Sequence, residues 1–342
     1  MPIEPASRIP HPVRTLADIG EDGLIAGLVE RFATLGTDPE GPVLVGPGDD
    51  AAVLQVPAGR LVASTDTLVE RLDFRREWST GRHVGIKVAA QNLADVAAMG
   101  ATPLALLVSL SAPGDLPVDW TDELSEGLAE ECARGGCRVV GGDLSSAQEI
   151  VVVGTALGLL PGPPVLRSGA RPGDIVALAG RVGPSAAGLA LLESGADPVL
   201  NEDLAELFEL HLAPRPPYPA GPSAASAGAT AMIDTSDGLL RDAARIARAS
   251  GVTLDLDPDR LDPDRLHPDP ALLEAARRLG GSARDWVLAG GEDHALLACF
   301  PPGTVVPGPF RIVGTVQERG SDDVTVGGRA WSGQDGWRHF AR

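Results

Sequence analysis

Apolar positions along the chain follow two different periods, and these periods alternate. Apolar residues three and four positions apart predict helices at 21–36, 81–100, 119–134, 185–194, 203–211, 237–250 and 270–280. Short apolar or alternating runs predict strands at 43–45, 61–65, 103–110, 138–140, 150–160, 174–180, 230–234, 252–256, 294–300 and 310–316. Because strands and helices alternate in both halves of the chain, the expected fold class is α/β (α+β).

A proline-rich segment separates the two halves. Residues 161–164 read PGPP, and three prolines in four residues cannot continue a strand, so they form a stiff, extended spacer. A chain of 342 residues also exceeds the size that one hydrophobic core usually serves. We therefore expect two domains, at 1–160 and 165–342. Within the second, 212–223 is predicted as a loop or the edge of a helix and 257–270 as a surface loop.

Charge and composition exclude several classes of function. The chain has 47 acidic and 28 basic residues, a formal net charge of −19, whereas nucleic acids and anionic membranes bind basic surfaces. We therefore expect no nucleic acid and no membrane as a partner. Lys87 is the only lysine, and it lies between Ile86 and Val88, so the Gly-Lys-Ser/Thr of a P-loop is missing. Three cysteines, no signal-peptide pattern and no apolar run of ~18 residues predict a cytoplasmic protein with buried thiols.

Six short acidic motifs, most of them next to glycine, carry the candidate chemistry. They are GPGDD at 46–50, STDT at 64–67, NLAD at 92–95, GGD at 141–143, DTSDG at 234–238 and GGED at 290–293. Glycine beside an acid lets the backbone approach a ligand, and carboxylates with hydroxyls suit Mg²⁺ that bridges phosphate oxygens. Each motif alone is equally consistent with a turn or a helix cap. They indicate a binding site only if several of them meet.

Other candidate groups are less specific. The segment from Gly183 to Ser185 begins a predicted helix, and its small residues suit either a phosphate near the amides or close helix packing. Arg167 and Arg171 follow the linker and either clamp a phosphate or lie in solvent. The six histidines lie at no metal-ligand spacing, and neither a Ser-His-Asp pattern nor a nucleophile elbow is present. No catalytic side chain acting as general base or nucleophile is therefore predicted.

Eight segments, taken together and in order, resemble the thiamine-monophosphate kinase family, which belongs to the superfamily of aminoimidazole ribonucleotide synthetase and selenophosphate synthetase. They are GDDAAVL (48–54), STDTLVE (64–70), KVAAQNLADVAAMGATP (87–103), GGD (141–143), RSGARPGD (167–174), SAAGLALL (185–192), IDTSDGLLRD (233–242) and GGEDHAL (290–296). A late GWRHF at 336–340 is similar to the closing aromatic segment of the family.

The resemblance implies an N-terminal mixed sheet with helices that pairs across a homodimer, a C-terminal α/β domain, and an active site between the two. It implies that several Mg²⁺ ions assist direct transfer of the γ-phosphoryl group of ATP to thiamine monophosphate, which gives thiamine diphosphate and ADP. Because the acceptor phosphate is already ionised, this transfer requires no general base.

The resemblance also assigns site positions, residue by residue. The metal positions are Asp49, Ser64, Thr65, Asp66, Asp95, Asp143, Asp234 and Asp237. The ATP-binding positions are Gly142, Asp143, Arg167 and Ser236, and the substrate-binding positions are Asp73, Glu292 and Trp337.

Three positions depart from the family pattern. Asp73 precedes Phe74, where the family usually carries a histidine that contacts the substrate. LSS at 144–146 stands where threonines usually follow GGD, and Pro184 stands where an aspartate is common. Two alternatives stay open: an ATP-dependent ligase similar to aminoimidazole ribonucleotide synthetase, and a catalytically inactive relative that binds nucleotide or thiamine phosphate.

Overall fold

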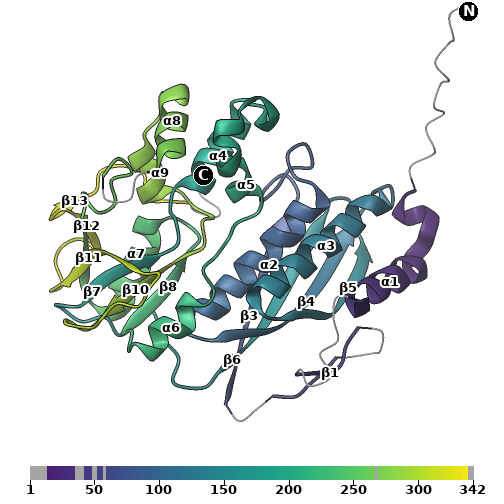
Figure 1. The fold of residues 1–342 in the computed structure, drawn as a ribbon, viewed down its shortest axis with the longest axis horizontal. Coiled ribbons are helices and arrows are strands. Elements are labelled where there is room, and N and C mark those ends of the chain that lie inside the picture. Colours follow the sequence, from purple (N-terminus) through teal and green to yellow (C-terminus); the bar gives the residue numbers. More distant parts are fainter. Residues whose placement is uncertain (1–13, 35–41, 48–51, 57–58, 266–268, 338–342) are drawn as a thin grey trace, which may run out of the picture.

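The structure is a computed structural model that describes residues 14–34, 42–47, 52–56, 59–265 and 269–337. Two β-sheets with helices packed on them lie side by side (Figure 1). The first sheet has the strand order β3–β6–β4–β5, and only β4 and β5 pair in parallel. Its strands are β3 (Arg60–Val69), β6 (Val151–Leu160), β4 (Thr102–Ala112) and β5 (Arg138–Ser146). This is the mixed N-terminal sheet that the family resemblance implies.

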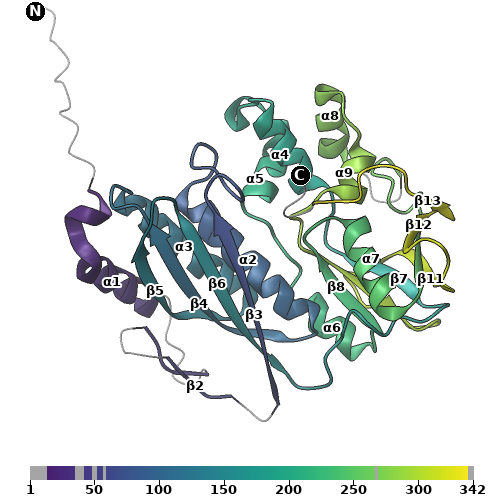
Figure 2. The same cartoon turned by 180° about the vertical axis from the view of Figure 1, so that it is seen from behind.

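Helices cover only one face of this four-stranded sheet. They are α2 (Gly81–Ala98) and α3 (Val118–Gly135), with α1 (Leu16–Thr34) beside α3. Along β6 the even-numbered residues are buried and the odd-numbered ones half-buried, as expected for a strand with one covered face. Figure 2 shows the other face with no helix over it. A short hairpin, β1 (Val43–Val45) and β2 (Val53–Leu54), packs near that face.

The second sheet has seven strands and carries the remaining helices. Its order is β13 (Arg329–Ala330), β12 (Val324–Val326), β9 (Thr253–Leu256), β11 (Arg311–Gln317), β7 (Ile175–Ala179), β10 (Ala295–Phe300) and β8 (Ala231–Thr235). The helices are α4 (Pro184–Glu193), α5 (Ala205–Leu212), α6 (Ala220–Ser226), α7 (Leu239–Ser250), α8 (Pro270–Leu279) and α9 (Ala283–Ala289). Short 3₁₀ turns lie at Pro198–Leu200 and Glu202–Leu204.

Helix α2 lies between the two sheets and belongs to both cores. Fifteen of its 18 residues are buried, which is typical of a helix enclosed on all sides. Leu93 and Val96 share one apolar cluster with Met232 and Leu296 of the second sheet. The close fit against α3 depends on glycine, because a Cβ at Gly85 would lie 2.2 Å from the carbonyl oxygen of Leu124. The position of α2 brings side chains of the first sheet to the edge of the second.

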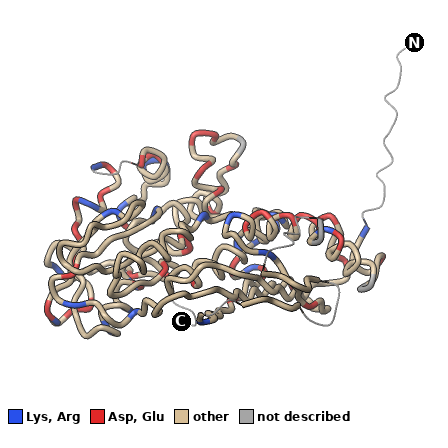
Figure 3. Tube along the Cα trace, turned by 60° about the horizontal axis from the view of Figure 1, so that its bottom comes forward, with Lys and Arg blue, Asp and Glu red and all other residues tan. Residues whose placement is uncertain are grey.

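Acidic positions are spread over both halves of the molecule, with basic positions scattered among them (Figure 3). The excess of acid is therefore not confined to one half of the molecule. Among the described helices, each is too short or too polar to cross a membrane.

The predicted α/β class is confirmed, and most predicted elements occur within a few residues of the expected bounds. Two strand predictions were too short. The strand predicted at 61–65 continues to Val69 and that at 138–140 to Ser146, so Asp66 and Asp143 lie inside strands rather than in turns. Both are edge strands, where charged side chains are tolerated and discourage aggregation. The segment predicted as a loop or helix edge at 212–223 contains the start of α6.

Candidate active site

The site begins where β3 meets α2. The Oγ of Ser64 donates a hydrogen bond to Oδ2 of Asp95 at 2.6 Å, and the backbone N–H of Asp66 donates to Oδ1 of Asn92 at 3.0 Å. A Cβ at Gly154 would lie 2.3 Å from Nδ2 of Asn92, so this amide fits against the sheet only because β6 has glycine there. These contacts hold Ser64 and Asp66 on the helix-covered side of the sheet.

Thr65 lies between them on the strand and therefore has the opposite orientation. Its Oγ1 donates to the carbonyl oxygen of Gly154 at 2.8 Å and lies 3.0 Å from Oγ1 of Thr155. The structure thus places Thr65 on the open face of the sheet, which no helix covers. Its neighbours Ser64 and Asp66, also predicted metal positions, lie on the helix-covered face.

The second sheet contributes Asp234 to the same region. This buried aspartate lies near the end of β8, and its Oδ2 is 3.2 Å from Nδ1 of His294. Burial, followed by the charge of Asp234, raises the pKa of Asp95 to about 6, while the hydrogen bond from Ser64 opposes the shift. Burial alone would lower the pKa of His294, but the contact with Asp234 outweighs it and raises the pKa. Asp95 of helix α2 and Asp234 of the second sheet therefore repel each other across the site.

A second cluster surrounds Glu292. Its Oε1 lies 2.7 Å from Nζ of Lys87, and its Oε2 lies 3.5 Å from Nδ1 of His211. The same ring nitrogen is 3.1 Å from Oγ of Ser185. Burial, with the nearby charge of Lys87, lowers the pKa of His211 to about 4. The sequence pattern predicted a role for Glu292 but none for Lys87 or His211, because their partners lie far away in the chain.

The start of α4 is not open to an external anion. The carboxylate of Asp293 accepts hydrogen bonds from the N–H groups of Gly183 at 2.6 Å and Ser185 at 2.9 Å. Burial raises the pKa of Asp293 to about 7, against the effect of these two bonds. A Cβ at Gly188 would lie 2.1 Å from the carbonyl oxygen of Leu207. The small residues of this helix therefore serve close packing, the second of the two readings that the sequence allowed.

The segments carrying Ser236, Asp237 and Trp337 lie side by side. The N–H of Glu292 donates to the carbonyl oxygen of Ser236 at 2.7 Å, and that of Trp337 donates to the carbonyl oxygen of Asp237 at 2.8 Å. Asp237 forms ion pairs with Arg245 and with Arg241. The indole of Trp337 is 61% exposed. Ser236, a predicted ATP position, therefore lies close to Glu292 and Trp337, two predicted substrate positions.

Gly142, Asp143 and Arg167 are not brought to this cluster within one chain, whereas Asp73 lies beside it, because its backbone carbonyl accepts a hydrogen bond from the Nζ of Lys87 that also contacts Glu292. Gly142 and Asp143 lie on β5, at the opposite edge of the first sheet from β3, and Arg167 is exposed in the segment before β7. The Oδ2 of Asp73 accepts a hydrogen bond from the N–H of Val69 at 2.8 Å and so closes the turn after β3. Asp49 lies outside the described residues.

The oxygen donors fit Mg²⁺ in kind. In the part of the chain that the structure describes, no three acidic, histidine or cysteine side chains already converge as ion ligands. Carboxylates and hydroxyls are nevertheless the ligands that this ion prefers. The raised pKa of Asp95 also reflects repulsion from Asp234 that a bound cation would relieve.

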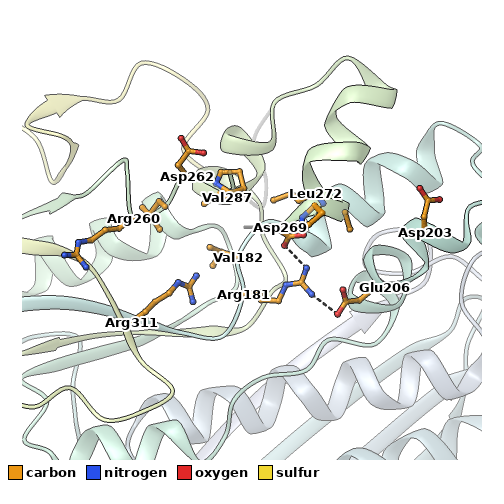
Figure 4. A pocket seen from close by; sticks show the side chains of 14 residues that line it. Arg181, Val182, Asp203, Glu206, Arg260, Asp262, Asp269, Leu272, Val287 and Arg311 are labelled. Carbon is orange, nitrogen blue, oxygen red and sulfur yellow. Dashed lines mark hydrogen bonds and ion pairs between the residues drawn. The ribbon is translucent and has the colours of Figure 1, made fainter. Parts of the chain in front are cut away.

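A cavity of about 740 Å³ lies elsewhere, between α8, α9 and the start of β11. Figure 4 shows Arg181 on its wall, paired with Glu206 at 2.8 Å and with Asp269 at 2.6 Å. None of the predicted site residues lines this cavity, so it is separate from the acidic motifs.

Comparison with known proteins first gives the class. Residues 48–160 match the family model described as AIR synthase related protein, N-terminal domain. The crystal structure of thiamine-monophosphate kinase from Stenotrophomonas maltophilia is similar to this chain, with a TM-score of 0.77 and 31% identity, covering 90% of this chain and 96% of that one. The fold is thus that of the AIR synthase related proteins.

Closer relatives identify the family. Thiamine-monophosphate kinase of Mycobacterium tuberculosis is 47% identical over 327 residues, which cover 95% of this chain and 93% of that protein. A structure described as AaThiL complexed with AMPPCP and TMP is 31% identical, with a TM-score of 0.75, covering 96% of this chain and 100% of that one. The chain belongs to the thiamine-monophosphate kinase family, which confirms the resemblance found in the sequence.

Proposed function

We propose that the chain transfers the γ-phosphoryl group of ATP directly to the phosphate of thiamine monophosphate, giving thiamine diphosphate and ADP. The observation that carries this proposal is that Ser64 of the first sheet and Asp95 of helix α2 meet Asp234 of the second sheet, in a chain 47% identical to a thiamine-monophosphate kinase. The relative complexed with AMPPCP and TMP supports the same two ligands for this chain.

The charge of the site suits this reaction. Both reactants are polyanions, and phosphoryl transfer depends mainly on positioning and charge neutralisation. We infer that Mg²⁺ ions are held by Asp49, Ser64, Asp66, Asp95, Asp143, Asp234 and Asp237. Bound there, Mg²⁺ would neutralise the phosphate oxygens during transfer. Thr65, the remaining predicted metal position, is left out because its hydroxyl lies on the open face and donates to Gly154. The acceptor phosphate is already ionised, so no side chain is assigned as a general base.

The remaining predicted positions divide between the two substrates. Gly142, Arg167 and Ser236 are assigned to ATP, and Asp73, Glu292 and Trp337 to thiamine monophosphate. The exposed indole of Trp337 suits stacking on a flat ring of the thiamine. Glu292 keeps 35% of its side chain exposed beside Lys87, so a ligand in the site can contact this side chain.

We further infer a homodimer that forms through the open face of the first sheet. Leu61 and Leu107 are 51% and 36% exposed on the described chain, which is unfavourable for apolar side chains left in water. Across the sheet, Asp66 of β3 is aligned with Gly142 of β5, through Gly154 of β6 and Val108 of β4. The two edge residues are therefore three strand spacings, or ~14 Å, apart. One ion cannot span that distance, so Asp143 of the partner subunit would complete the site.

The division into domains at 1–160 and 165–342, and a location in the cytoplasm, belong to the same proposal. The two separate sheets on either side of the proline-rich segment support the division.

A product assay tests the proposed function. The purified protein is incubated with ATP, Mg²⁺ and thiamine monophosphate, and thiamine diphosphate and ADP are quantified by chromatography. Equal amounts of both products are expected from the wild type, and none from Asp66→Asn with an unchanged circular-dichroism spectrum. Binding of thiamine monophosphate without product would identify an inactive relative. ADP and inorganic phosphate formed only with a formylglycinamidine-type substrate would identify a ligase.

A further inference from the structure

Lys87 has an unusual environment for a lysine. It is the only lysine of the chain, and it is buried in α2 with 3% of its surface exposed. Its Nζ lies 2.7 Å from Oε1 of Glu292 and donates to the backbone carbonyl oxygen of Asp73 at 3.0 Å. Because an unpaired ammonium is costly to bury, both contacts stabilise the buried charge. A single nitrogen thus joins the turn after β3 to the loop before β10.

Glu292 is held from three sides. Its backbone has a φ of 63°, a region that residues other than glycine rarely adopt, and its N–H donates to the carbonyl oxygen of Ser236 at 2.7 Å. Its Oε2 lies 3.5 Å from Nδ1 of His211. Burial alone would raise the pKa of Glu292, but the charge of Lys87 outweighs burial and lowers it. The carboxylate therefore stays ionised in one orientation.

The two side chains of this ion pair differ in exposure. The side chain of Glu292 is 35% exposed and that of Lys87 is 4% exposed. A ligand in the site can therefore contact the Glu292 side chain, whereas the ammonium of Lys87 is covered. Lys87 consequently affects a ligand through Glu292 and through the position of the Asp73 carbonyl.

We propose that Lys87 is a positioning residue for thiamine monophosphate, because it fixes the Glu292 carboxylate and the Asp73 turn relative to each other. This inference rests on the proposed function, in which both segments belong to the substrate site. A lysine that only stabilised the fold would affect the two substrates equally. A positioning lysine affects the binding of thiamine monophosphate and leaves the binding of ATP unchanged.

Steady-state kinetics separate these two roles. Lys87→Met is expected to raise KM for thiamine monophosphate about 10- to 100-fold, with KM for ATP within about twofold of the wild type. Lys87→Arg, which keeps the charge, is expected to recover part of the loss. Arg82→Met is the matched control, because it removes a cation from the same helix whose partner is Glu130 at 3.0 Å, away from Glu292. The control is expected to leave both KM values unchanged.

A double-mutant cycle tests whether Lys87 acts through Glu292. Glu292→Gln is expected to raise KM for thiamine monophosphate by a factor similar to that of Lys87→Met. The double variant is expected to be no worse than the more affected single variant, because both changes remove one interaction. Fully multiplicative effects, or an equal rise of both KM values in Lys87→Met, would overturn the inference.

The single lysine also permits a spectroscopic test that needs no Lys87 variant. Protein labelled with ¹³C,¹⁵N-lysine gives one Nζ–Cε correlation in an NMR spectrum, and this signal belongs to Lys87 without further assignment. The signal is expected to shift in Glu292→Gln and on saturation with thiamine monophosphate, and to shift less with Mg²⁺ and AMPPCP. A signal unchanged by thiamine monophosphate, at concentrations where calorimetry shows binding, would contradict the inference.

The two proposals can fail separately. A wild type that makes no thiamine diphosphate refutes the proposed function. An active wild type whose Lys87→Met variant behaves like Arg82→Met refutes only the role of Lys87.

Discussion

Ser64 and Asp95 join a strand to a helix through one short contact, in which the Oγ of Ser64 donates to Oδ2 of Asp95 at 2.6 Å. Burial and then the charge of Asp234, from the second sheet, raise the pKa of the same carboxyl group to about 6. The contact therefore marks the point where helix α2 and the second sheet bring like charges together. Such an arrangement lowers stability until a cation binds, and it favours cation binding for the same reason.

Replacing Asp95 should raise the stability of the protein and lower its activity. Asp95→Asn removes the repulsion from Asp234, so in the presence of EDTA the free energy of unfolding should rise by about 1–2 kcal/mol. Formation of thiamine diphosphate should fall at least ~100-fold, because a proposed Mg²⁺ ligand is lost. Urea denaturation and the product assay measure the two effects. Turnover close to that of the wild type would rule out the metal role of Asp95.

His211 should make stability depend on pH in a defined direction. Its folded-state pKa of about 4 lies below the ordinary value of 6.5, so the unfolded chain binds the proton more readily between these values. Stability from this group is fully present above pH 6.5 and is lost as the pH falls toward 4, by about 3 kcal/mol at most. In His211→Gln this part of the pH dependence should disappear, as measured by urea denaturation at pH 7 and pH 4.5. Parallel curves for both proteins would contradict the buried neutral state of His211.

Asp73 stands where the family usually has a histidine that contacts the substrate. Asp73→His should lower the apparent KM for thiamine monophosphate if this position faces the substrate. It should also cost about 1 kcal/mol of stability, because the N–H of Val69 loses its carboxylate acceptor. Asp73→Asn, which keeps an acceptor oxygen, is the control for the turn alone. An unchanged or higher KM in the histidine variant, with a normal KM in the asparagine variant, would place position 73 away from the substrate.

Subunit mixing tests whether two copies share one site. Asp66→Asn and Asp143→Asn should each be inactive alone. Co-expressed, they form mixed dimers in which one of the two sites has both aspartates, so about a quarter of the wild-type activity should return. Leu107→Asp, on the open face, should give monomers in sedimentation experiments and no complementation. Failure to complement in a preparation that contains mixed dimers would place both aspartates in the same subunit's site.

The helices and strands could be predicted from the sequence more fully than the contacts between them. The alternation in β6 and the apolar length of α2 follow directly from residue order, since each depends on neighbours a few positions apart. The helix α9 and the strands β12 and β13 were not predicted, because they are too short to show a period. The continuation of β5 through Gly141 and Gly142 was also missed, since glycine is unfavourable in strands and is tolerated at an edge.

Only part of the site was predicted, because a sequence pattern reports on residues that are close together in the chain. Short acidic motifs indicated Asp66, Asp95 and Asp234, because the signal lies within each motif. The ion pair between Lys87 and Glu292 depends on how α2 packs between the sheets, and no local pattern contains that information. The separation of Asp143 from Asp66 depends on strand order, which is also a long-range property.

The proposed reaction transfers the γ-phosphoryl group of ATP directly to thiamine monophosphate. The most direct measurement uses ATP labelled with ³²P at the γ position, together with Mg²⁺ and thiamine monophosphate, and locates the label in the products. The label is expected in the terminal phosphoryl group of thiamine diphosphate, in an amount equal to the ADP formed. Label found in inorganic phosphate, with thiamine monophosphate unchanged, would contradict this reaction.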